Sequence, residues 1–479
     1  MARSAILLIG TEKTGTTTLQ HFLAANRPAL AERGFLYPSF CGAINHTGLA
    51  AYALGPDKSD PLRAPWGPDV PTVRARLEAA ARAELAGPAT VIFASEHCHS
   101  RLTTPAEVET LLSFLNGFFD DIRIAVYLRR QDQVALSLYS TRLKSGDTDR
   151  RILPRTAPDD PFFNYDTSLA LWEDAFGHAA VTARLFDRKL LNGGSVVDDF
   201  VATWNLGPMA AFTPVPDQNE SIDAQAQELL RLANPALDAL PGLPLDEVRG
   251  PLAARLAALF PGRGARPARA DVEAFYGKYR ESNENVRRRF FPDRTTLFDE
   301  DFSAYPEAED PRDPTPQDFA AIAAKLHTAA VAESRRLEAE IAIRDARLHW
   351  TRNEPGSAEQ ALRRALHWCP DHAPAHRTLA EYLFRLDRLP EAIAVTRRAA
   401  VLAPDSWEYN HFLGILQRRA GDFTAAAAAQ ARALELNPGH AASRHELEQV
   451  LIRQADAEAR RVNGHPMHGG APWPSSVSP

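Results

Sequence analysis

Residues 5–18 read AILLIGTEKTGTTT, an apolar run followed at once by a loop that holds two glycines. The run Ala5–Ile9 predicts a buried strand, and the apolar spacing after the loop predicts a helix. Gly10 and Gly15 permit backbone angles that turn successive N–H groups inward, and the helix amino terminus adds partial positive charge. Because Lys13 can also neutralise a phosphate, the stretch predicts a P-loop-like phosphate cradle.

The loop differs from a Walker A motif, in which lysine directly follows the second glycine. Here Lys13 precedes Gly15, and Thr16 stands at the position of the Walker lysine. Four hydroxyl groups can donate to phosphate oxygens, from Thr14, Thr16, Thr17 and Thr18. The alternative is an ordinary strand-to-helix turn, but no structural need explains a lysine and four threonines on one such turn.

Three further apolar runs predict strands at Val91–Ala94, Ile122–Leu128 and Val181–Phe186. Amphipathic stretches at Thr72–Ala86 and Pro105–Phe119 predict helices between them. This alternation indicates an α/β fold, a mostly parallel sheet with helices on both faces. Ligands of such sheets bind beyond the carboxyl ends of the strands, so we expect the site residues there.

An arginine and a serine follow the strand that ends at Leu128. Arg129 stands at the strand end, and Ser137 lies eight residues on, in the expected next helix. The forked guanidinium donors of arginine suit a phosphate dianion, and the serine adds a hydroxyl. Arg130 would take the place of Arg129 if the register were shifted by one. The alternative is a solvated arginine pair and a surface serine.

Taken together, the two motifs resemble the family of PAPS-dependent sulfotransferases, where PAPS is 3′-phosphoadenosine 5′-phosphosulfate. The phosphosulfate loop of that family reads roughly Pro-Lys-Ser/Thr-Gly-Thr-Thr, and here Glu12 replaces the proline. Ile9–Thr17 is similar to a bacterial branch, and the resemblance covers about residues 5–305. It implies that Lys13 contacts the bridging oxygen, while loop hydroxyls and amides, including those of Thr14–Thr18, hold the 5′-phosphate.

The resemblance also implies a 3′-phosphate site at Arg129 and Ser137, PAPS as donor, PAP as product and no metal. It places a general base where the strand Val91–Ala94 ends. We expect Glu96 to be that base, with His97 second, unless Glu96 only caps the next segment. Neighbouring residues on a strand point to opposite faces, so we do not expect the run His97–His99 to bind a metal.

Other stretches are weaker candidates for the site. Asn45-His46 and Tyr52 are expected to cover it, and Pro235–Arg269 to form a lid near the acceptor. Asn164-Tyr165 and Gln218–Ser221 resemble the bacterial branch. Arg287–Arg289 could contact a phosphate, but we interpret this run as a solvated helix face.

A repeat dominates the second half of the chain. Pro370, Pro404 and Pro438 lie 34 residues apart, each after a similar apolar segment. This period resembles the tetratricopeptide repeat (TPR), a helix–turn–helix unit. We expect full repeats at Ala373–Ser406 and Trp407–His440, with half-repeats at Ser357–Pro370 and Ala441–Gln454.

The predicted organisation has five parts. They are a sulfotransferase domain at 1–305, a linker at 306–316, a connecting helix at 317–350, an all-α TPR-like repeat domain at 351–456 and a disordered tail at 457–479.

Composition bounds the function. The chain has 479 residues, a net charge of −7 and three dispersed cysteines. The cysteines suggest no disulfide framework, no apolar run is long enough to span a membrane, and the charge balance suggests no nucleic-acid surface, so we expect a cytoplasmic protein. The Ala- and Arg-rich, Lys-poor composition suggests a GC-rich bacterial genome. The expected partners are a small-molecule or glycan acceptor and a protein bound by the repeats. Two alternatives remain, an inactive TPR interaction protein and an ATP-dependent kinase, although Lys13 is misplaced for the kinase.

Overall fold

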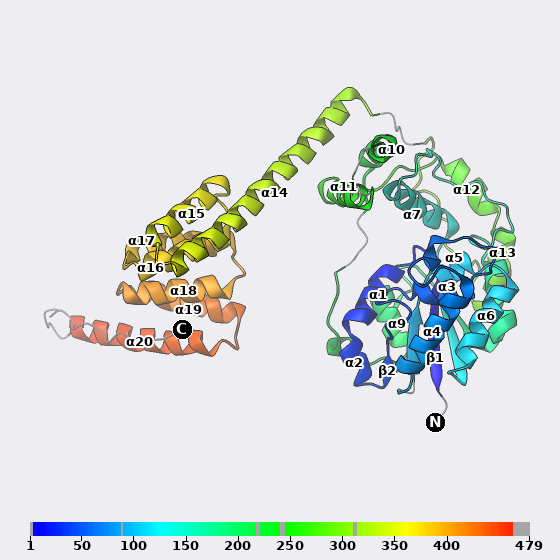
Figure 1. Ribbon diagram of the computed structural model, residues 1–479, viewed down its shortest axis with the longest axis horizontal. Helices are drawn as coiled ribbons and strands as arrows, with labels where there is room; N and C mark the ends of the chain where they lie inside the picture. Colours follow the sequence, from blue (N-terminus) through cyan, green and yellow to red (C-terminus); the bar gives the residue numbers. More distant parts are fainter. Residues whose placement is uncertain (1–2, 88–89, 217–220, 240–244, 310–313, 463–479) are drawn as a thin grey trace. The chain divides into compact units, whose positions relative to one another are not determined.

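The computed structural model describes residues 3–87, 90–216, 221–239, 245–309 and 314–462 (Figure 1). The chain divides into two compact units, Met1–Ile322 and Ala323–Pro479. The first is an α/β domain and the second is built from helical repeats, as the sequence predicted.

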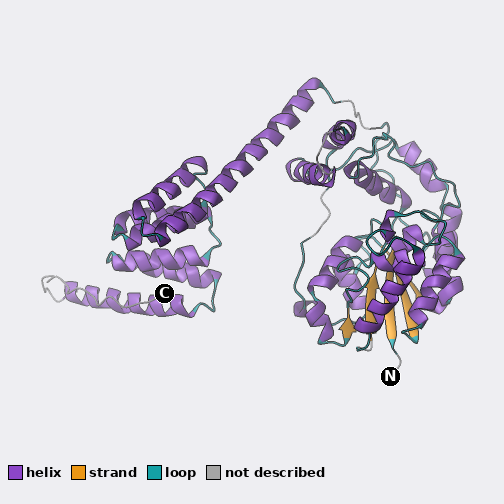
Figure 2. Cartoon of the chain, viewed as in Figure 1, coloured by secondary structure: helices purple, strands orange, loops and turns teal. Residues whose placement is uncertain are grey.

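The sheet of the first unit has five parallel strands in the order β2-β3-β1-β4-β5 (Figure 2). Their bounds are β1 Ser4–Gly10, β2 Phe35–Leu36, β3 Thr90–Ala94, β4 Asp121–Leu128 and β5 Val181–Leu185. The four predicted strands are all present, and only the two-residue β2 was missed. Because β1 lies between β3 and β4, the carboxyl ends of these three strands adjoin one another, at the edge where ligands of parallel sheets bind.

Helices cover both faces of this sheet. The helices of the first unit are α1 Thr16–Ala25, α2 Arg27–Ala31, α3 Thr47–Ala53, α4 Val70–Glu84, α5 His97–Arg101, α6 Pro105–Asn116, α7 Gln131–Lys144, α8 Tyr165–Phe176, α9 Val196–Thr203, α10 Ala224–Asp238, α11 Leu245–Leu259, α12 Arg269–Gly277 and α13 Arg280–Phe290. Of these, α10, α11 and α12 pack on α7 rather than on the sheet (Figure 1). The start of α4 is set by Asp69, whose side chain accepts from the amide of Thr72 at 2.8 Å.

Alternation along β1 produces two cores. Ala5, Leu7 and Ile9 join one cluster with α3, α4, α6 and α8, whereas Ile6 and Leu8 join the other with α1 and α9. All five side chains are buried, as expected for a parallel strand covered on both faces.

A buried ion pair ties a distant segment to the start of α7. Arg130 donates to both carboxylate oxygens of Asp132, at 2.8 and 3.0 Å, and to the carbonyls of Asp299 and Asp301. The hydroxyl of Tyr305 also donates to Asp132. Arg130 is therefore a structural residue, and the alternative register that would have placed it on a phosphate is wrong.

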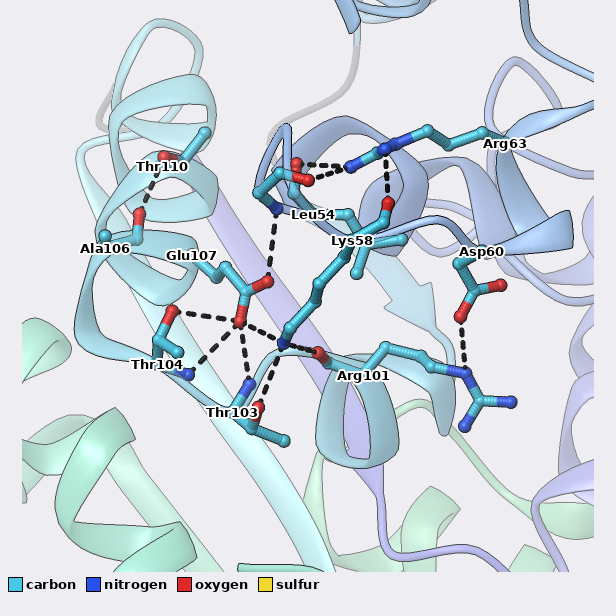
Figure 3. A network of polar contacts seen from close by, with 11 residues as sticks. Leu54, Lys58, Asp60, Arg63, Arg101, Thr103, Thr104, Ala106, Glu107 and Thr110 are labelled. Atoms are coloured by element: carbon cyan, nitrogen blue, oxygen red, sulfur yellow. Dashed lines mark hydrogen bonds and ion pairs between the residues drawn. The ribbon is translucent and has the colours of Figure 1, made fainter.

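The segment between α3 and α4 is fixed by the polar network of Figure 3. Lys58 donates to Glu107 at 2.7 Å and to the carbonyl of Arg101 at 2.9 Å. The guanidinium of Arg101 pairs with Asp60 at 3.0 Å (Figure 3). It also lies 3.7 Å from Glu12 of the phosphate loop. The network thus links the segment, α5 and the loop.

The second unit is a series of helix pairs. The helices are α14 Pro316–Thr351, α15 Pro355–Trp368, α16 Ala373–Arg385, α17 Leu389–Leu402, α18 Trp407–Arg419, α19 Phe423–Leu436 and α20 Ala441–Val462. The two predicted full repeats are confirmed as the pairs α16–α17 and α18–α19. Gly414 lies where α18 and α19 pack closely, because a Cβ at this position would stand 2.5 Å from the side-chain nitrogen Nε2 of Gln430.

A further pair replaces the predicted half-repeat at Ser357–Pro370. The end of α14 packs on α15 through a shared core that includes Ala339, Ala346 and Leu362. The expected connecting helix at 317–350 therefore supplies the first helix of a repeat. At the other end α20 continues to Val462, and the rest of the predicted tail, like residues 310–313 of the linker, lies outside the described residues.

Candidate active site

The phosphate loop joins β1 to α1 at the carboxyl edge of the sheet. Gly15 has φ 74° and is the N-cap of α1, and Lys13 also has a positive φ of 66°. Gly10 is needed for close approach, because a Cβ there would stand 3.0 Å from the Cα of Glu96. The loop and the predicted base therefore adjoin each other.

Two threonines hold the loop in place from within. Thr11 donates through its amide and its hydroxyl to the carbonyl of Tyr127, at 3.1 and 3.0 Å. Thr14 is buried and its hydroxyl donates to the carbonyl of Thr11 at 2.6 Å. The hydroxyl proton of Thr14 is thus used inside the loop, which corrects the expectation that it donates to a phosphate. Thr17 is exposed, whereas Thr16 and Thr18 are mostly buried.

Lys13 lies among four charged groups. Burial is the largest effect and lowers the pKa of its ammonium group; the carboxylates of Glu12 and Glu96 oppose this, and the positive charges of Lys144 and Arg129 add to it. Two carboxylates and two cations therefore act on the charge of Lys13, and a bound anion would add a further electrostatic interaction with it.

Arg129 points at the loop. It donates to the carbonyl of Lys13 at 2.7 Å and to the side-chain oxygen of Gln133 at 3.3 Å, and it lies over the ring of Phe186. Burial lowers the pKa of its guanidinium. Ser137 lies two helical turns along α7 and is half-buried.

Glu96 is held from two sides at the start of α5. One oxygen accepts from Gln20 of α1 at 2.6 Å, and the other accepts from Asn45 at 3.1 Å. This leaves lone pairs on both oxygens for a further donor. Asn45 therefore lies at the site, as predicted.

His97 follows Glu96 as the first residue of α5 and is half-buried. Its Nδ1 is buried and meets no hydrogen-bond partner among the described residues. The charge of Glu96 acts on the ammonium group of Lys13.

A cavity of about 390 Å³ adjoins the loop. Gly15 and Thr18 form one wall, and Phe186, Leu191 and Val196 contribute apolar surface. The cavity is large enough for a heteroaromatic ring, and Arg129 lies over the ring of Phe186 at its edge.

Several predicted residues have structural roles instead. His46 accepts from the amide of Ala94 at 3.0 Å, and burial lowers its pKa to about 3. The hydroxyl of Tyr52 donates to Glu78 at 2.9 Å, which directs it to α4 rather than the site. The remaining residues of this kind are Asn164, which caps α8, and Tyr165, which donates to the carbonyl of Arg129. Arg287, Arg288 and Arg289 pair with Glu284, Asp166 or Glu173, which fits their interpretation as helix-face residues.

Two further predicted segments are the stretch Gln218–Ser221 and the lid near the acceptor. Gln218, Asn219 and Glu220 lie outside the described residues. The predicted lid Pro235–Arg269 contains the end of α10 and all of α11, and Asn234 fixes α10 to the end of α7 by donating to the carbonyl of Leu143 at 2.9 Å.

Sequence reasoning missed Gln20, Gln133 and Lys144. Gln133 stands four residues before Ser137, and Lys144 stands seven residues after it. Gln133, Ser137 and Lys144 therefore share one face of the helix. That spacing was a usable signal. Gln20 carried none, because its partner Glu96 is distant in sequence.

Comparison with known proteins gives limited matches. The chain matches no protein-family model. An uncharacterized protein of Archaeoglobus fulgidus is 27% identical over 182 residues, which cover 35% of this chain and 46% of that protein. The chain thus spans about half the length of the relative it matches.

Solved structures resemble the chain only in part. They include the first TPR of Spaghetti (RPAP3) bound to an HSP90 peptide (17% identity, TM-score 0.24, 25% of this chain and 95% of that chain). The first TPR domain of human RPAP3 is 17% identical with a TM-score of 0.24, and the match covers 26% of this chain and 96% of that chain. The Sgt2 TPR domain from Aspergillus fumigatus is 19% identical with a TM-score of 0.24, and the match covers 29% of this chain and 92% of that chain. Such low TM-scores add nothing to what the helix pairs themselves show.

Within the described ranges, no helix has both the length and the apolar character needed to cross a membrane. No group of three or more His, Cys, Asp or Glu side chains in the same part of the chain is arranged to hold a metal ion.

Proposed function

We propose that the α/β domain is a sulfotransferase that moves a sulfuryl group from PAPS to a hydroxyl acceptor, a carbohydrate or another small hydroxylated molecule. The observation that carries this proposal is the meeting of Lys13, Arg129 and Glu96 at the carboxyl edge of β1, β3 and β4. A cationic loop, a second anion site and a carboxylate base are the three parts that the reaction needs.

The donor is expected to lie along the loop. Its 5′-phosphosulfate meets Lys13 and the amides at the start of α1, where the helix dipole favours an anion. Its 3′-phosphate meets Arg129 and Ser137, which distinguishes PAPS from ATP. The adenine ring fits the apolar cavity beside Gly15 and Phe186.

The transfer step requires one proton acceptor and one cation. The acceptor oxygen attacks sulfur and loses its proton to Glu96, forming a new S–O bond. The S–O bond to the 5′-phosphate breaks, and its electron pair stays on the former bridging oxygen, so that PAP leaves. Lys13 stabilises the charge that develops on this oxygen.

Replacement of the base tests the proposal. In Glu96→Gln the release of PAP from PAPS, measured with a panel of hydroxylated acceptors, is expected to fall by about 10²- to 10⁴-fold, because no group takes the proton. Binding of PAP, measured by calorimetry, should remain close to wild type.

His97→Asn serves as the matched variant for the same pair of measurements. Loss of turnover in His97→Asn with turnover retained in Glu96→Gln would move the role of base to His97. No PAP release by the wild type with any acceptor in the panel would count against the enzyme.

A second candidate function is protein binding by the repeats. Three arginines lie over aromatic rings of neighbouring first helices: Arg385 over Trp350, Arg377 over Phe412 and Arg419 over Phe384. All six side chains come from α14, α16 and α18, the successive first helices of the pairs, and stacked repeats of this kind use concave surfaces for binding. This row favours a partner protein, which either brings the acceptor to the enzyme or is the main ligand of an inactive chain.

A further inference from the structure

A cavity of about 510 Å³ lies between α12 and the segment that joins α7 to α8, and we call it the α12 pocket. Residues 150–155 line it on one side. Asp271 and Phe275 of α12, with Lys278 directly after this helix, line it on another. The α12 pocket shares no lining residue with the cavity beside Gly15, so it is a separate feature of the α/β domain.

Cations outnumber carboxylates around the α12 pocket. Its charged lining residues are all exposed, and they comprise Arg150, Arg151, Arg155 and Lys278 against Asp271 and Glu309. The whole chain carries a net charge of −7, so this excess of positive charge is local. A pocket with such an excess attracts anions.

Two of these cations, Arg155 and Lys278, are the ones on which recognition depends. Arg151 is already paired with Asp149 at 2.7 Å. Arg155 and Lys278 line the pocket from separate segments, and the ammonium nitrogen of Lys278 lies 5.7 Å from the centre of the Phe275 ring. An anionic group in the pocket would therefore meet charged donors from two sides.

Apolar residues form the inner surface of the α12 pocket. Ile152, Pro267 and Phe275 line it and are buried. Apolar surface with a few polar groups around it is the usual composition of a ligand site. The combination suits a sugar acid, because the acidic group binds to cations, the hydroxyls donate to carboxylates, and the C–H groups of the ring contact apolar side chains.

The segment that carries Arg155 is held in place at both ends. Arg142 of α7 donates to the carbonyl of Arg151 at 3.0 Å. The hydroxyls of Thr156 and Tyr279 share a hydrogen bond of 2.5 Å, which ties the segment to the chain directly after α12. A ligand of the α12 pocket therefore meets a preformed site and does not have to order the segment when it binds.

A row of aromatic rings connects the α12 pocket to α5, which begins directly after Glu96. The ring centre of Phe275 lies 5.5 Å from that of Phe163, which lies 4.9 Å from that of Phe162. The ring centre of Phe162 lies 5.5 Å from that of His99 in α5. An acceptor that reaches from the pocket to Glu96 is extended, as an oligosaccharide is.

We propose that the α12 pocket binds an acidic sugar residue of an oligosaccharide acceptor, a hydroxyl of which is presented to Glu96. This inference rests on the proposed function and names its substrate class. Arg155 and Lys278 bind the carboxylate or sulfate of the sugar, and Asp271 accepts from one of its hydroxyls. The sugar ring lies against the apolar inner surface.

Calorimetry on the full chain tests the pocket without turnover. The probes are oligogalacturonate and sulfated maltohexaose, each with its neutral counterpart, the methyl ester and unsulfated maltohexaose. The acidic forms are expected to bind, and the neutral forms to bind about tenfold more weakly, the usual loss for one hydrogen bond to a charged group. Comparison of the two acidic probes shows whether a carboxylate or a sulfate is preferred, and inorganic sulfate tests for a simple anion site.

Three variants are measured with the same probes. Arg155→Gln and Lys278→Met, which keeps the apolar stem, should each bind the preferred acidic probe about tenfold more weakly and bind PAP as the wild type does. Arg123→Gln is the matched control, because Arg123 is an exposed arginine at the start of β4, away from the pocket. This control should change neither affinity.

PAP release from PAPS, with the acidic probes as acceptors, tests the link to the enzyme. Arg155→Gln and Lys278→Met should each raise KM for the acceptor about tenfold and leave kcat within about twofold, since both residues bind the acceptor away from the reacting atoms. A fall in kcat with KM unchanged, or no PAP release with either acidic probe, would overturn the role of the pocket in acceptor binding.

The binding measurements separate failure of the pocket from failure of the proposed function. Equal affinity for acidic and neutral probes, unchanged affinity in both pocket variants, or binding of inorganic sulfate as tight as that of the oligosaccharides would overturn the acidic-sugar site. PAP would still bind in each of these cases, and the proposed function would stand. A wild type that does not bind PAP would instead overturn the proposed function.

Discussion

Lys13→Ala is expected to lower the rate of sulfuryl transfer by about 10²- to 10³-fold. Removing one preorganised group that stabilises charge in the transition state has effects of this size. Lys13 is half-buried in a loop where its backbone has a φ of 66°, and the charges of Glu12 and Glu96 act on its ammonium group. The measurement is the turnover number for PAP release at saturating PAPS.

Thr17→Ala is the matched control in the same loop. Thr17 is exposed and contributes a hydroxyl but no charge, so its effect should be far smaller than that of Lys13→Ala. If turnover in Lys13→Ala stayed within about twofold of the wild type, the loop would not be stabilising the leaving group, and the proposed chemistry would be wrong.

Asp132→Ala is expected to reduce the free energy of unfolding by about 3 to 5 kcal/mol, the usual effect of removing one partner of a buried ion pair. Asp132 is fully buried and receives both Arg130 donors and the hydroxyl of Tyr305. Its loss leaves the guanidinium of Arg130, which is 8% exposed, without its counter-charge. Equilibrium unfolding in urea measures the change.

Asp149→Ala provides the comparison at the surface. Asp149 pairs with Arg151 in an exposed ion pair, which contributes little because water and salt screen it. Similar losses of stability in Asp132→Ala and Asp149→Ala would show that the segment at Asp299–Tyr305 is not anchored by the buried pair.

The strands and the loop could be predicted because each depends on local sequence. Buried parallel strands are continuous apolar runs, and four of the five were visible as such. The exception, β2, consists only of Phe35 and Leu36, too short to form a pattern. It is a strand because β3 offers an open edge for pairing.

The partners of polar side chains could not be predicted because they depend on distant segments. Arg130 and Arg129 are adjacent and chemically identical, yet one pairs with Asp132 and the other faces the loop. The sequence favoured Arg129 but left Arg130 as an alternative, because the exact end of β4 and the start of α7 decide which arginine faces the loop. The same holds for Arg289, whose partner Asp166 is 123 residues away.

The extent of the repeats was misjudged for a different reason. No repeat-ending proline stands before the end of α14, and most of the buried residues on its contact surface are alanines. Small residues pack closely against a neighbouring helix but resemble the rest of an alanine-rich helix in sequence. Spacing alone was the signal, because Ala339 stands 34 residues before Ala373.

The central claim is that the loop and Arg129 bind a nucleotide with phosphates at both the 5′ and 3′ positions. Thermal unfolding of the full chain, with PAP, AMP or Mg-ATP and without other metal, tests it most directly. PAP at about a hundredfold its dissociation constant should stabilise the wild type by about 2.7 kcal/mol. AMP should have little effect, and Arg129→Ala should lose the difference between PAP and AMP. No stabilisation by PAP, or stabilisation by Mg-ATP alone, would contradict the account and favour an interaction protein or a kinase.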